Sequence, residues 1–208
     1  MDFEELISLT GDEPVFESSL LLAGDVDPAA VQRQLSRWVE AGKIYRLTRG
    51  LYAPAPPFAK VRPHPFLVAN RLVQASYVSL ESALAHYGII PEYVPVTTSI
   101  TTRRPRSYDT PLGTFSFRHV KTELLWGYQT MQVAPEQEAL VAHAEKALLD
   151  LIYLRPQADT PSFLRTLRLH TAERLDFDRL DTFAQRTGSP KLRRAAHRLH
   201  HLDQELSP

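Results

Sequence analysis

The chain has 208 residues, of which 43% are hydrophobic and 23% charged, and none is a cysteine. This composition is that of an ordinary globular protein, and the lack of cysteine excludes disulfide scaffolds, thiol catalysis and cysteine-ligated metal sites. The 24 basic and 24 acidic side chains cancel, which argues against a protein that coats nucleic acid non-specifically.

No targeting segment or membrane span is expected. The chain begins with the acidic sequence Met1–Glu5, where a signal peptide would be basic. No uncharged apolar run reaches the ~18 residues that a membrane-spanning helix needs. We therefore expect a soluble, cytoplasmic protein without a membrane partner.

The charges are segregated along the first part of the chain. Residues 1–27 carry eight acidic and no basic side chains, whereas residues 28–54 carry five basic side chains and one acidic. Such a change of sign over a short stretch indicates a small module with one basic face.

This module is predicted to contain three helices followed by a β-hairpin. Asp27 followed by Pro28 is typical of a helix start, and the apolar residues that follow form a single stripe. Gly50 supplies the positive φ that a tight turn requires. The predicted elements are helices over 3–9, 16–23 (ending near Gly24) and 28–42, and hairpin strands over 44–47 and 51–53.

The segment after this hairpin is rich in proline. Five of the 16 prolines fall between Pro54 and Pro65. Proline lacks the N–H that a sheet ladder needs and favours extended geometry in the preceding residue. The sequence therefore predicts a semi-rigid linker over 56–65, which separates a domain at 1–55 from a larger one at 66–208.

The larger domain is predicted to mix helices and strands and to end in helices, so the expected fold class is α+β. β-Branched and aromatic residues indicate the strands, and apolar periodicity indicates the helices. The predicted helices are 66–73, 80–87, 144–154, 162–170, 177–187 and a last one from Pro190, and the predicted strands are 94–102, 114–120, 128–133 and 138–142.

Three helices followed by a two-stranded wing is the pattern of the winged helix-turn-helix, whose last helix enters the major groove. Arginine pairs with guanine and glutamine with adenine through two hydrogen bonds, while cations on the wing reach phosphates. An alternative is a winged helix used only for protein contacts, with a solvated basic face. The predicted DNA-binding residues are Gln32, Arg33, Ser36 and Arg37 on the helix and Lys43, Arg46, Thr48 and Arg49 on or beside the hairpin.

Two further basic clusters are candidates for secondary contacts. Arg103, Arg104 and Arg106 follow a predicted strand, where they contact phosphate or form a solvated hairpin tip. Together with Arg118 and Lys121 they could also receive an acidic partner surface. The second cluster lies on the last helix and comprises Arg193, Arg194 and Arg198.

The last helix also carries His197, His200 and His201, which invite comparison with a metal site. On a helix, residues 197 and 201 share a face while 200 diverges, and no neighbouring residue completes a coordination sphere. A solvated or DNA-facing basic helix is the favoured interpretation. No pattern in the chain predicts a metal or a cofactor.

A nuclease is the rival interpretation from another functional class, because a mixed sheet flanked by helices can hold a restriction-type active site. Such sites usually place an acid two residues before a lysine on a strand. None of the residues two positions before the five lysines is acidic. The simplest form of that active site is therefore absent, and a rearranged one stays open.

Several segments resemble the AbiEi-type antitoxins of type IV toxin–antitoxin systems. The resemblance covers roughly residues 15–155 and becomes less clear after residue 155. The segments that carry it are residues 35–52, 77–92, 97–106, 111–120 and 144–153.

The resemblance implies a bacterial transcriptional autorepressor and antitoxin rather than an enzyme. In that family the winged helix binds inverted repeats upstream of its own operon, an arrangement compatible with a dimer on DNA. The C-terminal domain supplies antitoxin activity against a nucleotidyltransferase-like toxin, either by direct binding or indirectly. Carried over to this sequence, the DNA-reading positions are Gln32, Arg33, Ser36 and Arg37, and the wing positions are Lys43, Arg46 and Arg49.

Overall fold

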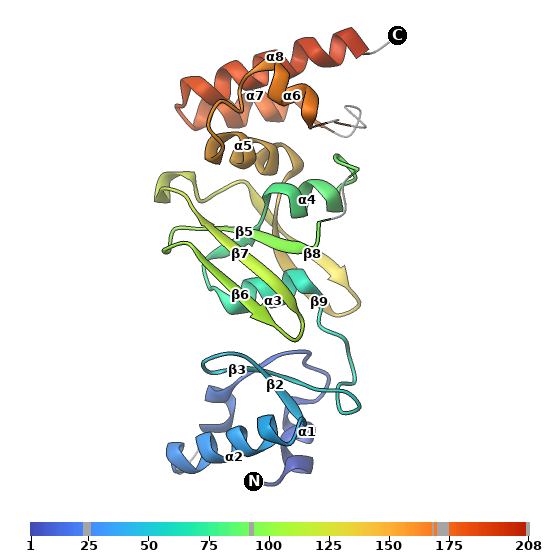
Figure 1. Ribbon diagram of the computed structural model, residues 1–208, viewed down its shortest axis with the longest axis vertical. Coiled ribbons are helices and arrows are strands. Elements are labelled where there is room, and N and C mark those ends of the chain that lie inside the picture. The colour runs from blue at the N-terminus through green and yellow to red at the C-terminus, as the bar shows by residue number, and fades with distance from the viewer. Residues whose placement is uncertain (23–25, 92–93, 168, 170–174, 207–208) are drawn as a thin grey trace.

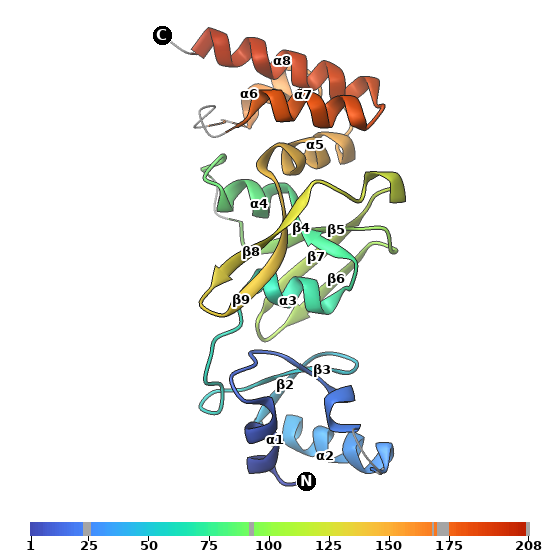
Figure 2. The same ribbon diagram turned by 180° about the vertical axis from the view of Figure 1, so that it is seen from behind.

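The fold is mixed α+β, as the sequence predicts, and the molecule is elongated (Figures 1 and 2). The computed structural model describes residues 1–22, 26–91, 94–167, 169 and 175–206. A small N-terminal unit lies at one end, a mixed sheet lies in the middle and a group of helices lies at the other end. The first and last helices, α1 (Phe3–Thr10) and α8 (Pro190–Leu206), therefore lie at opposite ends of the molecule.

The N-terminal unit combines short helices with a small antiparallel sheet of order β1-β3-β2. The prediction of a helix over 16–23 is wrong for residues 16–22, which the structure describes. Phe16 pairs with Tyr52 in the sheet, so the segment begins as a strand and continues as one 3₁₀ turn; Ala23 and Gly24 lie outside the described residues. The elements are α1 (Phe3–Thr10), β1 (Phe16–Glu17), η1 (Ser18–Leu22), α2 (Pro28–Glu40), β2 (Ile44–Thr48) and β3 (Leu51–Pro54).

The larger unit is built on a six-stranded sheet of order β6-β7-β5-β4-β9-β8. Two of its strands were not expected. β4 (Ser76–Val78) has three residues, too few for an alternating pattern, and β6 (Arg106–Thr110) is a mostly polar edge strand. The four expected strands are present as β5 (Val96–Thr101), β7 (Gly113–His119), β8 (Tyr128–Ala134) and β9 (Gln137–Ala142).

Helices surround this sheet and continue beyond it to the C-terminus. Within the described ranges, no helix is both long and apolar enough to cross a bilayer. The helix expected over 162–170 ends earlier, at Thr166, and its last predicted positions include residues outside the described ones. The helices are α3 (Pro65–Leu72), α4 (Leu80–His86), α5 (Ala144–Leu154), α6 (Pro161–Thr166), α7 (Phe177–Arg186) and α8 (Pro190–Leu206), with the 3₁₀ turn η2 (Thr122–Leu124).

The hairpin of β2 and β3 contributes to two separate hydrophobic clusters. Ile44 and Tyr52 pack with α1 and α2 in the small N-terminal cluster. Leu47 and Leu51, on the opposite face of the same hairpin, pack into the large cluster of the sheet and C-terminal helices. Because alternate residues of a strand point to opposite faces, one hairpin serves both clusters.

The proline-rich segment after the hairpin is attached at both of its ends. Ala55 is buried, and its N–H donates to the carbonyl of Lys43. At the other end, the Gln137 side chain accepts a hydrogen bond from the His64 N–H at 2.8 Å and donates to the Arg62 carbonyl at 3.0 Å. The domain boundary expected within 56–65 stays a prediction.

A buried ion pair connects α5 to β4 in the middle of the larger unit. Lys146 and Asp150 are 1% and 3% exposed, and their side chains contact each other one helical turn apart. The Asp150 carboxylate also accepts hydrogen bonds from Tyr77 and Ser79, both at 2.9 Å, and the Lys146 Nζ donates to the Tyr77 hydroxyl at 2.7 Å. Burial lowers the pKa of Lys146 and raises that of Asp150, because each charged group is removed from water.

We expect the Asp150→Ala substitution to lower the free energy of unfolding by about 3–5 kcal/mol, because it leaves the Lys146 ammonium buried without a counter-charge. The double variant Lys146→Met/Asp150→Leu should lose less stability than the sum of the losses in Lys146→Met and in Asp150→Leu, because no lone charge is left. Urea unfolding followed by circular dichroism measures both quantities. Additive losses would show that the two side chains do not act as a pair.

Acidification should destabilise the fold through His64. Its Nδ1 accepts the N–H of Phe66 at 3.2 Å and so caps α3, and burial together with His86 lowers its pKa. The unfolded chain therefore binds the proton more tightly, so stability is present above pH ~6.5 and falls as the pH drops below that value. We expect His64→Asn, which keeps a cap acceptor but does not titrate, to show a smaller loss between pH 7 and pH 5 in urea unfolding. An equal loss in both proteins would contradict this assignment.

Candidate nucleic-acid interface

The face of α2 predicted to read DNA is open to solvent. Val31, Leu35 and Trp38 are buried against the N-terminal cluster, as the apolar stripe predicts. The helix lies at the end of the molecule, on the far side of the hairpin from the large sheet (Figure 1). The outward residues are all exposed: Ala29, Gln32, Arg33, Ser36, Arg37 and Glu40.

Arg33 has an acidic neighbour at the start of the helix. Asp27 caps α2 by accepting the N–H groups of Ala29 and Ala30 at 2.9 and 3.2 Å. The same carboxylate lies 3.4 Å from the Arg33 guanidinium, and both side chains are mostly exposed, at 59% and 63%. An exposed pair of this kind contributes about 0–1 kcal/mol, so Arg33 can leave Asp27 at little cost.

The other three positions on this face differ in how firmly they are held. Gln32 donates from Nε2 to the Tyr52 hydroxyl at 3.4 Å, which connects α2 to the hairpin. The Ser36 hydroxyl donates to the Gln32 carbonyl at 3.0 Å. The Arg37 guanidinium makes no hydrogen bond or ion pair with any residue that the structure describes. Arg37 is therefore the most available of the four side chains.

Two of the wing positions lie beside α2 with different freedom. Arg46 is exposed and lies on the same face of β2 as Ile44, which is the face toward α2. Lys43 is half-buried, and its ammonium lies 4.6 Å from the centre of the Phe3 ring, so a cation–π contact holds it against α1. We therefore expect a smaller contribution from Lys43 than from Arg46.

The hairpin tip lies next to the larger unit. Gly50 has a φ of 83°, and its carbonyl accepts the Ser18 N–H at 2.8 Å, so the turn is fixed against η1. Thr48 and Arg49 line a polar hollow of about 310 Å³ together with Arg71 of α3 and Arg103. We call Arg49, Arg71 and Arg103 the junction arginines.

The structure thus brings together arginines that the sequence placed in two separate clusters. None of the junction arginines has an ion-pair partner within the described part of the chain. Arg71 was not singled out by sequence analysis. It is an isolated cation on a helix, and only the packing of α3 beside the hairpin gives it a role.

The other two arginines predicted together with Arg103 lie in and beside the connection from β5 to β6. Arg104 is exposed, and Arg106 donates to the Tyr108 hydroxyl at 3.2 Å. These arginines do not form the tip of a hairpin, which was the alternative to a phosphate contact. β5 and β6 are not paired, because β7 lies between them in the sheet. Arg118 lines a different hollow, so it does not join this cluster.

The basic side chains of α8 are partly engaged in internal contacts. Arg194 donates to the Asp159 carboxylate at 2.9 and 3.1 Å, and Arg198 contacts the same residue. These contacts attach α8 to the segment before α6, whereas Arg193 is exposed without an ion pair among the described residues.

The histidines of α8 diverge as expected. The rings of His197 and His201 are 4.5 Å apart, while His200 lies 3.1 Å from the Asp181 carboxylate. In the described ranges, no three histidine, aspartate or glutamate side chains come close enough together to hold a metal ion.

Comparisons with known proteins add no family assignment. A scan against models of protein families finds no match to the chain, and a search of curated proteins also finds none.

Proposed function

We propose that residues 1–55 form a winged helix-turn-helix that binds duplex DNA through α2 and the β2–β3 hairpin. The chain order α1, β1, η1, α2, β2, β3 and the sheet order β1-β3-β2 are compatible with that fold. The observation that carries the proposal is the outward face of α2, where Arg33 and Arg37 are exposed, on a helix at the end of the molecule away from the larger unit (Figure 1).

In the proposed complex, α2 enters the major groove and the hairpin follows the phosphate backbone. Arg33 and Arg37 read base edges, with Gln32 and Ser36 beside them. Arg46, Thr48 and Arg49 lie where a wing contacts phosphates or the minor groove. The other two junction arginines lie beside the hairpin tip on the larger unit, in the hollow that Glu17 also lines.

We further propose that the protein is a transcriptional autorepressor and the antitoxin of a type IV toxin–antitoxin system. The sequence resemblance to AbiEi-type antitoxins supports this step, since it spans both the hairpin region and α5. The operator would contain inverted repeats upstream of the protein's own gene. The opposing toxin would be a nucleotidyltransferase-like protein.

Substitutions on α2 test the DNA-binding proposal. We expect Arg33→Ala or Arg37→Ala to weaken binding to the upstream DNA by about 1–3 kcal/mol and to relax specificity at one base position. Fluorescence anisotropy with the upstream fragment and with a scrambled duplex gives both affinities. Arg165→Ala, an exposed arginine of α6 at the opposite end of the molecule, is the matched control and should bind as the parent does.

Arg49→Ala provides the contrasting result in the same titrations. A phosphate contact carries no sequence information, so its loss should weaken both duplexes alike and reduce the slope of log affinity against log salt by about 0.9. Unchanged binding by both α2 variants would contradict the assignment of the reading face. Magnesium-dependent cleavage of plasmid DNA by the parent protein would favour the nuclease alternative.

The two proposed activities should be separable. Arg33→Ala/Arg37→Ala should lose repression of a reporter fused to the upstream DNA, because the reading face is gone. The same variant should still restore growth of cells that express the neighbouring nucleotidyltransferase-like toxin, because we assign antitoxin activity to the larger unit. Loss of rescue at equal protein levels would show that toxin control depends on DNA binding.

A further inference from the structure

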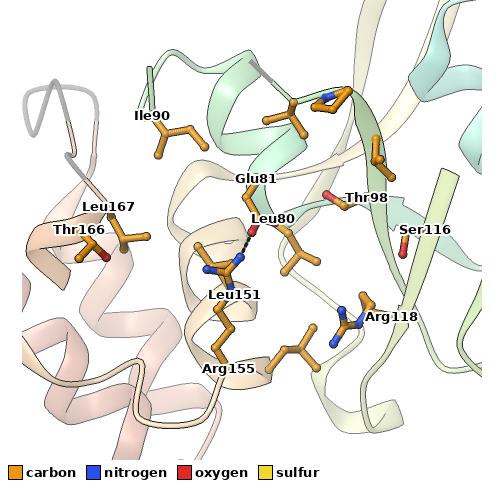
Figure 3. Close-up of a pocket in the computed structure, with 14 residues that line it drawn as sticks. Leu80, Glu81, Ile90, Thr98, Ser116, Arg118, Leu151, Arg155, Thr166 and Leu167 are labelled. Atoms are coloured by element: carbon orange, nitrogen blue, oxygen red, sulfur yellow. Dashed lines mark hydrogen bonds and ion pairs between the residues drawn. The ribbon is translucent and has the colours of Figure 1, made fainter. Parts of the chain in front are cut away.

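A hollow of about 500 Å³ lies between the sheet and helices α4, α5 and α6 (Figure 3). Its volume falls in the range of about 300–1,000 Å³ that is typical of small-molecule sites. The helical side is largely apolar and is formed by Leu80, Ile90, Leu151, Leu154 and Leu167. These residues come from distant parts of the chain, so only the fold assembles them.

The sheet side of the hollow carries polar groups that the protein itself does not use. Ser116 and Arg118 are two residues apart on β7, so both side chains lie on the same face, and both line the hollow. Neither the Ser116 hydroxyl nor the Arg118 guanidinium has a hydrogen-bond or ion-pair partner among the residues with described positions. Thr98, by contrast, already forms hydrogen bonds within the protein: its Oγ1 lies 2.9 Å from the Ser79 carbonyl and 3.0 Å from the Ser82 hydroxyl.

The charges around the hollow define what it can accept. Glu81 of α4 and Arg155 next to α5 form an ion pair across the helical side, which Figure 3 marks with a dashed line. This pair neutralises itself, so among the lining residues that the structure describes Arg118 is the cation without a counter-charge. A ligand group with one negative charge complements the exposed Arg118 guanidinium. A carboxylate meets this requirement and matches the planar guanidinium through two hydrogen bonds.

The backbone at the apolar side is fixed in an unusual conformation. Leu80 has a φ of 56°, which is a strained backbone conformation for a residue other than glycine. Its neighbour Ser79 donates to the buried Asp150 carboxylate, so the internal ion pair holds this backbone in place. The Leu80 side chain is thereby directed into the hollow (Figure 3).

We propose that this hollow binds a small amphiphilic monocarboxylate, with its carboxylate on Arg118 and Ser116 and its hydrocarbon portion against the leucines. Such a ligand would neutralise the free cation and cover the apolar side in one molecule. The site is separate from the DNA interface, and its occupancy does not depend on the function proposed for α2.

Isothermal titration calorimetry of the full chain with octanoate, below its micellar concentration, tests the proposal. We expect saturable one-site binding, with 1-octanol about tenfold weaker or worse because it lacks the charge. Affinity should rise about three- to fourfold for each methylene added toward decanoate, because each one is buried against the leucines. Affinity independent of chain length would mean that only surface charge attracts the anion, and would overturn the proposal.

Variants assign the site. Arg118→Gln should reduce octanoate affinity by about tenfold or more, because a charge-assisted hydrogen bond is lost. Arg104→Gln changes an exposed arginine outside the hollow and should bind octanoate as the parent does. Circular dichroism confirms that each variant is folded. Equal affinity in Arg118→Gln, or no saturable heat in the parent protein, would overturn the proposal whether or not the chain binds DNA.

Discussion

The architecture depends on a hairpin that packs against a hydrophobic cluster on each face. Tyr52 packs toward α2, whereas its neighbours Leu51 and Ala53 pack into the large cluster. An N-terminal unit on a free linker would leave that second face to solvent. Because two hydrophobic clusters share one pair of strands, reorienting the N-terminal unit would expose apolar surface from the large cluster. The position of the hairpin tip relative to the sheet is therefore set by packing, and so is the proximity of Arg49 to Arg71 and Arg103.

A buried ion pair, Lys146 with Asp150, fixes the packing at the centre of the larger unit. Lys146 and Asp150 are placed four residues apart on α5, and each would be costly to bury alone. Tyr77 and Ser79 satisfy the remaining polar atoms, so the pair fixes the register of α5 against β4. Leu80, with its strained backbone, directly follows Ser79, which donates to the Asp150 carboxylate. The shape of the hollow that Leu80 lines is thus a consequence of an interaction that lies outside the hollow.

The parts of the fold that could be predicted from sequence are those with a local cause. The buried stripe of α2 follows from spacing alone, and so does α5, whose bounds agree with the expected 144–154. Residues 16–22 were misassigned because β1 exists only through pairing with β3. β6 was missed because an edge strand of polar residues has no buried face to mark it. Tertiary pairing, which no short window of sequence contains, decides both cases.

The same distinction applies to the sites. The exposed cations of α2 could be identified because a helix with one apolar face necessarily presents the other. The pairing of Arg33 with Asp27 could not, although both residues lie in one short segment, because it depends on where the cap residue directs its second oxygen. The Asp27 carboxylate affects which part of DNA the proposed DNA-reading face of α2 can contact through Arg33. A phosphate must displace Asp27 from Arg33 and then lie beside the remaining negative charge, whereas a guanine edge is neutral and presents only acceptor dipoles. The helix cap therefore disfavours backbone contact at Arg33 relative to base contact, which is the direction that specific recognition requires.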